Sequence, residues 1–534
     1  MDAPQPLVAE NRSTFARIVQ NVTSNWAALL VNTLISFVLA PIVVNGLGST
    51  YYGIWTLVMQ FTGYLWLFDF GVRESVVKYV AQYHAAGEAE RLESTVRTAV
   101  SVYAVVSLVA LLAAALVSAT IHLLFNIPPE TIQTARLAAF LTAATVAQSF
   151  LSNVFVGVLM GLQRFYAVSR PAILFSLFRA VATYALLTNG YGIVALSGLH
   201  LVLSLASSLL VFLLCRVYLP TVSFRPVRPV RLEVAKLLNY GKYVLLSNIG
   251  DKIVFATDAI VIGLFFPIAM LTPYAIAGTL IGNMRSMVMA MASIVSPLTS
   301  ALQPGNRNES LSHVAQTGSK AAVLVGLPLC IGFITLGERF VGLWMGETYA
   351  PTAGGILVVL SLGYIVGLPY HTISGVFYGL GAHRVIAWLR LLEGALNLGL
   401  SVILLRVYGV AGVAAGTAIP QIVMVGCVLP MLLPRFFPIR LRDYYRSVYL
   451  RPLAASVPFW IAGWLIATVV RPETLGRFLG WGALSLVTYL VPCWIVALTA
   501  VERGYVVDVV RQRLPRRPVR PLGVTVSPDV RREV

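Results

Sequence analysis

Residues 98–122 read TAVSVYAVVSLVALLAAALVSATIH, a run without a single Asp, Glu, Lys or Arg. A strand of a membrane barrel needs only ~9–11 residues and alternates apolar with polar side chains, so this run does not fit a barrel. A helix that crosses the hydrocarbon core needs ~20 apolar residues. Because only helices and closed barrels satisfy their backbone groups in lipid, the run predicts a membrane-spanning helix.

The composition extends this conclusion to the whole chain. Hydrophobic residues make up 58% of the 534 residues and charged residues 11%, whereas a soluble domain is about 25% charged. We therefore predict an all-α polytopic membrane protein with about 14 transmembrane helices. The predicted spans are 21–44, 52–71, 98–122, 136–160, 171–188, 193–215, 243–266, 273–301, 317–336, 353–381, 385–405, 409–433, 453–470 and 478–500.

Basic residues predict the orientation of these spans. Most of the 39 Lys and Arg residues fall on one side of the alternating topology, concentrated in 216–242, 435–451 and the segment after 502. By the positive-inside rule we predict that both termini are cytosolic, and we expect the membrane to be a bacterial inner membrane. The net charge of +18 then reflects topology and contact with anionic membrane lipids rather than nucleic acid binding. The four cysteines form no metal-ligand spacing, so we expect no metal site.

The chain also resembles itself at an offset near 218 residues. GVLMGL at 157–162 returns as GVFYGL at 375–380, and YGIVALSG at 191–198 returns as YGVAGVAAG at 408–416. Six helices per repeat is an even number, so both copies insert in the same direction and form two parallel six-helix repeats. The predicted domains are an N-terminal lobe 1–219, a basic cytosolic linker 220–242, a C-terminal lobe 243–434, two additional C-terminal helices in 435–501 and a basic cytosolic tail 502–534.

Several stretches resemble a known family. They are LGSTYYGIWTL (47–57), DFGV (69–72), TDAIVIGLFF (257–266), GVFYGL (375–380) and YGVAGVAAGTAI (408–419). They are similar to the polysaccharide-transport branch of the multidrug/oligosaccharidyl-lipid/polysaccharide (MOP) exporter superfamily. The resemblance implies alternating access, with a lateral opening between the first and eighth helices.

Charged residues within the predicted spans mark the candidate site. Asp251 and Lys252 lie about 12–14 Å from the inner end of 243–266, and Arg285 lies about 12 Å above the inner boundary of a ~30 Å core. Ionisable residues at this depth usually face a watery cavity or a substrate path. The alternative is mutual neutralisation, in which Asp251 or Asp258 pairs with Arg285, and Arg390 pairs with Glu393. The candidate substrate-path or ion-path residues are Arg285, Lys252, Asp251, Asp258, Arg179, Arg390 and Glu393.

The stretch LWLFDFGVRESVVKYVAQYHA (65–85) passes from apolar to charged. We expect one helix that leaves the membrane here, with Asp69/Arg73 and Glu74/Lys78 as acid-before-base i,i+4 pairs. The alternative is that Asp69 and Arg73 form an inner gate. Trp66 is expected at the interface or in packing, although its ring could also stack on a sugar, and His200 and His371 are expected to be structural.

Together these features favour a transporter over an enzyme. The outer segments 122–135 and 337–352 are short for a membrane polysaccharide polymerase, and no nucleophile triad or nucleotide loop occurs. The leading hypothesis is a flippase for an undecaprenyl-pyrophosphate-linked oligosaccharide in polysaccharide biosynthesis, with no cofactor. Coupling to H⁺ or Na⁺ through Asp251 or Asp258 and drive by the membrane potential both remain open. The alternatives are a multidrug or other lipid exporter and a scaffold, and polysaccharide polymerase or assembly proteins are candidate partners.

Overall fold

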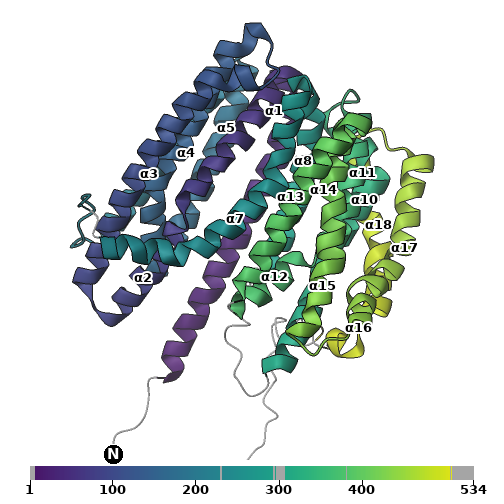
Figure 1. Ribbon diagram of the computed structural model, residues 1–534. Coiled ribbons are helices and arrows are strands. Elements are labelled where there is room, and N and C mark those ends of the chain that lie inside the picture. Colours follow the sequence, from purple (N-terminus) through teal and green to yellow (C-terminus); the bar gives the residue numbers. More distant parts are fainter. Residues whose placement is uncertain are drawn as a thin grey trace, which may run out of the picture.

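The computed structural model describes residues 7–228, 231–292, 295, 307–380, 382–504 and 507. Within these ranges the chain is a bundle of long helices without a strand (Figure 1). Most of the predicted tail 502–534 and the end of the predicted span 273–301 lie outside the described residues. The helices of the first half are α1 (Leu7–Gly63), α2 (Val72–Ala86), α3 (Ala89–Leu124), α4 (Ile132–Gly161), α5 (Phe165–Thr188) and α6 (Ile193–Tyr218).

The second half begins at Arg231. Its helices are α7 (Arg231–Phe265), α8 (Leu271–Ala292), α10 (Arg307–Met345), α11 (Ala350–Gly367), α12 (Tyr370–Gly379), α13 (His383–Tyr408), α14 (Val410–Gln421), the π-helix η5 (Ile422–Val428), α15 (Leu429–Leu432), α16 (Leu441–Tyr445), the π-helix η7 (Arg446–Leu450), α17 (Arg451–Leu465), the π-helix η8 (Ile466–Val470), α18 (Leu475–Pro492) and the π-helix η9 (Cys493–Ala497).

The predicted spans correspond to these helices. Eleven segments of the described chain are long and apolar enough to cross a membrane. One of them, Leu30–Asp69, holds two predicted spans, because α1 bends at Gly48, where φ is +76°. Helices α7 and α8 are not among the eleven, and they account for the remaining two of the fourteen predicted spans. The prediction of an all-α polytopic membrane protein is confirmed.

The stretch 65–85 differs from the expectation of one continuous helix. A 3₁₀ helix, η1 (Tyr64–Asp69), is followed by Phe70 and Gly71 in left-handed conformation, and α2 then starts in a new direction. The break abolishes the i,i+4 register on which the expected Asp69/Arg73 pair depends. Asp69 instead accepts hydrogen bonds from Tyr103 and Asn153, and Arg73 pairs with its neighbour Glu74 at 2.8 Å.

Both halves meet at the face where α1 bends, which we call the bend face. Thr272 donates to the carbonyl of Ser49 at 2.7 Å, and Asn126 donates to the carbonyl of Leu264 at 3.4 Å. We call the part of α1 after Gly48 its second arm. A Cβ added to Gly53 would lie 2.3 Å from the carbonyl oxygen of Ile268, so this second arm approaches the α7–α8 turn closely. These contacts close the space between the halves at the bend face.

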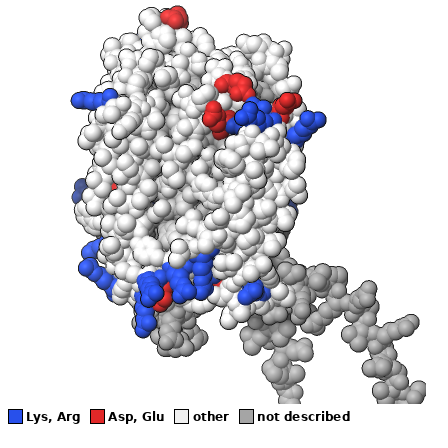
Figure 2. Space-filling view, turned by 90° about the vertical axis from the view of Figure 1, so that its right-hand side faces the viewer, with Lys and Arg blue, Asp and Glu red and all other residues white. Residues whose placement is uncertain are grey.

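The opposite face carries α2 and the start of α7, and we call it the α2 face. Residues 231–242, expected within the linker, form the first turns of α7, where Ser75 donates to the carbonyl of Leu237 at 2.7 Å. In Figure 2, Lys and Arg gather near the lower end of the molecule and again, mixed with acids, near the upper right. Between them lies a broad band of other residues, as expected where lipid tails cover the surface.

Candidate functional site

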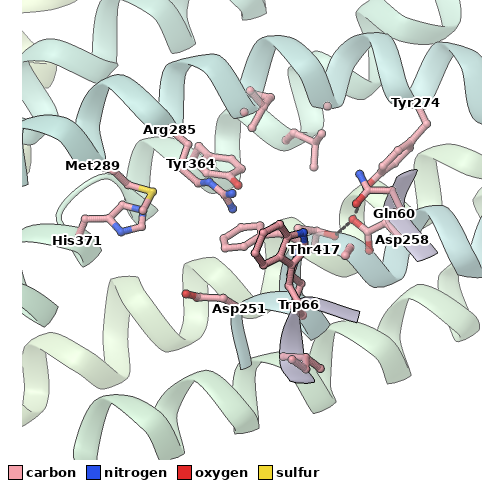
Figure 3. Close-up of a pocket in the computed structure, with 18 residues that line it drawn as sticks. Gln60, Trp66, Asp251, Asp258, Tyr274, Arg285, Met289, Tyr364, His371 and Thr417 are labelled. Carbon is pink, nitrogen blue, oxygen red and sulfur yellow. Dashed lines mark hydrogen bonds between the residues drawn. The ribbon is translucent and has the colours of Figure 1, made fainter. Parts of the chain in front are cut away.

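A cavity of about 470 Å³ lies between the two halves of the helix bundle. The second arm of α1 and η1 form one wall, and α7, α8, α11, α12 and α14 form the others (Figure 3). Four of the predicted path residues line it together, namely Arg285, Lys252, Asp251 and Asp258. His371 and Trp66, which were expected to be structural, interfacial or packing residues, line it as well.

The spacing along α7 explains why its polar residues share this wall. Asp251, Phe255 and Asp258 follow one another at i, i+4 and i+7, which places them on one face of a helix. The same helix packs closely on α13 at its other side, where a Cβ added to Gly250 would lie 2.7 Å from the Cβ of Arg390. Small residues permit such close approach between membrane helices. The close packing brings Arg390 within reach of Asp251.

Arg390 is the centre of a buried ion cluster. Its Nε lies 3.0 Å from Asp251 and its Nη1 lies 2.8 Å from Glu393. The side chains of Arg390 and Glu393 are each 2% exposed, whereas that of Asp251 is 46% exposed. The guanidinium also lies over the ring of Tyr370, at 3.8 Å. The Arg390–Glu393 pair considered from the sequence is therefore present, and both residues are buried beside the cavity.

Within the described part of the chain Arg285 forms no ion pair with Asp251 or Asp258, so this part of the mutual-neutralisation alternative is wrong, whereas its Arg390–Glu393 pair is present. Figure 3 shows Arg285 pointing into the cavity, well separated from Asp258. Its guanidinium lies 3.8 Å from the ring centroid of Phe255, a cation–π contact. Its Nε is buried and finds no hydrogen-bond partner among the described residues. Within the described residues the charge of Arg285 is thus left without a carboxylate partner.

Asp258 is held by hydroxyl groups instead. Its Oδ2 accepts hydrogen bonds from Tyr274 and from Thr417, the latter at 2.7 Å, and the side chain is buried (Figure 3). Thr417 in turn accepts from the amide of Asn397 at 3.0 Å. The Oδ1 atoms of Asp258 and Asn397 are buried and have no hydrogen-bond partner within the described residues. Two acceptor oxygens therefore remain unsatisfied in this cluster.

Lys252 lines the cavity beside η1. Its backbone carbonyl accepts from Tyr64, whose hydroxyl also lies 2.7 Å from Thr257, so η1 is tied to α7. The ammonium group of Lys252 forms no ion pair in the described part of the chain. The acids near the cavity are occupied by Arg390 or by hydroxyl groups, and Lys252 and Arg285 remain the cations that face the open space. The arrangement suits an anionic guest.

The other predicted residues lie elsewhere. Arg179 lines a separate cavity within the first half, between α4, α5 and α6. Asp69 is enclosed by Tyr103 and Asn153, and neither Asp69 nor Arg73 lines the central cavity. Among the described residues, no group of three or more His, Cys, Asp or Glu side chains could hold a metal ion.

Sequence reasoning missed Tyr274 and Thr417, which donate to Asp258, and Asn397, which donates to Thr417. Each is a polar residue inside an apolar span, which was the available signal. Because hydroxyl and amide groups are common in membrane helices and cost little there, they do not stand out as charges do.

Known proteins resemble this chain in sequence and in fold. The model of a family described as polysaccharide biosynthesis protein matches residues 18–304, more than half of the chain. A protein of Haloferax volcanii described as a probable low-salt glycan biosynthesis flippase, Agl15, is 25% identical over 183 residues. That alignment covers 34% of this chain and 39% of the relative, so the match spans well under half of the relative's length.

Two solved structures share the fold. The lipid II flippase MurJ in an inward closed conformation superposes with a TM-score of 0.68 at 14% identity, covering 92% of this chain and all of that one. An inward-facing multidrug resistance transporter of the MATE family, within the MOP superfamily, gives 0.63 at 17% identity, covering 79% of this chain and 95% of that one. With the family match, these findings confirm the resemblance to the polysaccharide branch of the MOP superfamily.

Proposed function

Because the chain belongs to the polysaccharide biosynthesis protein family, we propose that it is a flippase for a lipid-linked oligosaccharide, with undecaprenyl pyrophosphate as the carrier. The observation that carries the proposal is a pair of cations, Arg285 and Lys252, that have no carboxylate partner among the described residues and line a cavity between the two halves. A pyrophosphate supplies the missing negative charge, and the planar guanidinium can bind it through two parallel hydrogen bonds.

The proposed path keeps the lipid tail in the bilayer while the polar head group passes through the cavity. The contacts of Thr272 with Ser49 and of Asn126 with Leu264 close the cavity at the bend face. Alternating access requires a second conformation in which these contacts part and the α2 face closes. An inside-negative membrane potential favours the outward movement of an anion by about 2.3 kcal/mol per charge per 100 mV.

Asp258 is the candidate for ion coupling. Its unsatisfied Oδ1, the unsatisfied Oδ1 of Asn397 and the hydroxyl of Thr417 give a cluster of oxygen atoms that H⁺ or Na⁺ can join. If Asp258 couples transport, Asp258→Asn abolishes the dependence of export on a Na⁺ or pH gradient while the protein remains abundant in membranes. Export that still follows the gradient in this variant contradicts the coupling role and leaves the membrane potential as the drive.

The test of the transport proposal replaces Arg285. In vesicles that contain a lipid-pyrophosphate oligosaccharide, Arg285→Ala should slow flipping at least tenfold, since a charged hydrogen bond contributes roughly 1.5–3 kcal/mol. Arg285→Lys should retain part of the rate, because it keeps the charge and loses the planar fork. Arg406→Ala removes an exposed arginine of α13 and is the matched control. Normal flipping by Arg285→Ala at normal abundance refutes the proposed phosphate contact.

The proposal also places both termini in the cytosol of a bacterial cell, with the bend face toward the periplasm. Reporter fusions after Val534 and within 216–228 should report the cytosol, and a fusion within 126–131 should report the periplasm. A periplasmic signal from the C-terminal fusion contradicts this orientation.

A further inference from the structure

A second cavity, of about 290 Å³, lies inside the first half of the bundle between α4, α5 and α6. At ~30 Å³ per water molecule it has room for about ten waters, comparable to one sugar ring with its hydroxyl groups. Serine side chains line much of it, and Arg179 and His200 contribute nitrogen groups. The transport path described above does not use this cavity.

The hydroxyl groups of the second cavity can accept further hydrogen bonds. Ser208 donates to the amide oxygen of Gln148 at 3.2 Å, and the amide nitrogen of Gln148 donates to Ser204. Ser149 uses its hydroxyl hydrogen on the carbonyl of Val146 at 2.6 Å. A hydroxyl can donate one hydrogen bond and accept two, so these serines still have free acceptor sites. Such a wall suits a guest that carries several hydroxyl groups.

Arg179 supplies a charge that is not balanced locally. It stands 14 residues after Phe165, the first residue of α5 (179 − 165 = 14), so it lies about 21 Å along the helix. It has no ion pair and no hydrogen bond among the described residues. A charge at this depth costs a few kcal/mol or more unless water or a counter-charge meets it. An anion in the cavity removes that cost.

The described titratable groups around Arg179 do not supply the negative charge that an anion in the cavity would bring. His200, on α6, lies edge-on to the ring of Trp55 at 5.2 Å and brings no negative charge. Asn153 of α4 lines the cavity and donates to Asp69 at 3.3 Å, and Asp69 also accepts from Tyr103. The carboxylate of Asp69 is therefore already occupied by neutral donors.

The second cavity adjoins the central one. Trp55, which contacts His200, also lines a pocket of about 310 Å³ with Gln60, Asp258 and Tyr274. Those three residues line the central cavity as well, so that pocket adjoins it. Trp55 and His200 thus lie between the space assigned to the pyrophosphate and the serine-lined cavity.

We propose that the serine-lined cavity is a subsite for an acidic sugar residue, one that carries a carboxylate, in the head group of the transported lipid. Arg179 pairs with the carboxylate, and the serine hydroxyls bond the hydroxyls of the sugar. The inference rests on the proposed function for its source of ligand, and it narrows the substrate class to glycans with an acidic sugar.

Binding is tested first, without transport. Purified protein in nanodiscs is titrated with glucuronate, glucose and chloride by saturation-transfer NMR. Glucuronate should bind better than glucose, Arg179→Gln should weaken it at least about tenfold, and Arg179→Lys should restore part of the affinity. Arg406→Gln, which changes an exposed arginine of α13, is the control and should leave glucuronate binding unchanged. Equal binding of glucose and glucuronate, displacement of glucuronate by chloride at equal concentration, or no effect of Arg179→Gln overturns the proposal.

This inference rests on the proposed function, and transport assays distinguish failure of the subsite from failure of that function. Two lipid-pyrophosphate disaccharides are compared in vesicles, one with a glucuronate and one with a glucose at the same position. Arg179→Gln should slow the acidic substrate alone, whereas Arg285→Ala should slow both. If Arg285→Ala slows neither, the proposed function fails, while the binding result for Arg179 still decides the subsite. If Arg179→Gln slows both substrates equally, the subsite is refuted and the transport proposal stands.

Discussion

Replacing Arg390 by leucine is the sharpest test of how the second half is held together. The change leaves the Cβ that packs on Gly250 in place and removes the guanidinium between Asp251 and Glu393. Glu393, at 2% exposure, keeps a charge with no counter-ion, whereas Asp251, at 46%, can be hydrated from the cavity. Removing one partner of a buried ion pair costs about 3–5 kcal/mol, so Arg390→Leu should lower the free energy of unfolding by that amount.

The measurement is reversible unfolding of purified protein in mixed micelles with increasing SDS, followed by tryptophan fluorescence. The double change Arg390→Leu with Glu393→Leu removes the stranded charge, so it should recover most of the loss. Asp251→Asn is the matched control and should cost less than Arg390→Leu, because its site is wet. A loss below about 1 kcal/mol for Arg390→Leu, or a double variant as unstable as the single one, refutes this account of the cluster.

Two further changes test other contacts. Gly53→Ala would place a Cβ 2.3 Å from the carbonyl oxygen of Ile268, so it should reduce thermal stability. Gly198→Ala is the control and should be neutral or stabilising, because its Cβ meets nothing within 4 Å. Equal melting temperatures of the two variants contradict the close approach. Burial raises the pKa of Glu502, but hydrogen bonds from Lys320 and Thr499 outweigh it and lower the pKa below its ordinary value. The stabilisation by ionised Glu502 is therefore present above the ordinary glutamate pKa and lost as pH falls through the lowered one. Melting temperatures from pH 7 to 3 should show an acid-side loss that Glu502→Gln lacks, and identical pH profiles contradict it.

Much of the candidate site could be read from single residues. Counting 1.5 Å per residue from the ends of two predicted spans places Asp251, Lys252 and Arg285 at nearly one depth, and these three line one cavity together with Asp258. A charge inside an apolar span is conspicuous because lipid penalises it. The depth of a residue along a helix is therefore a one-dimensional property that sequence carries.

Other features depended on geometry between distant segments. Arg179 was grouped with the central charges by its depth, yet α5 turns it toward α4 and α6 and into a different cavity. The break at Phe70 and Gly71 was not foreseen, because a glycine within an apolar-to-charged stretch fits a continuous helix as well as a turn. A local sequence pattern gives little information on how a helix is rotated about its axis or on which helices it packs against.

Composition and the length of the apolar runs are enough to predict a helical membrane protein, because a chain in lipid must satisfy its own backbone groups. Short motifs point to the polysaccharide branch of the MOP superfamily, which the family match confirms. Which charges neutralise one another depends instead on how the helices pack. Gly250 lets α13 approach α7 so closely that Arg390 forms ion pairs with both Asp251 and Glu393. Arg285 therefore faces the cavity without either carboxylate. An ion pair forms over 3–4 Å between side chains of separate helices, so the way those helices pack decides the partner.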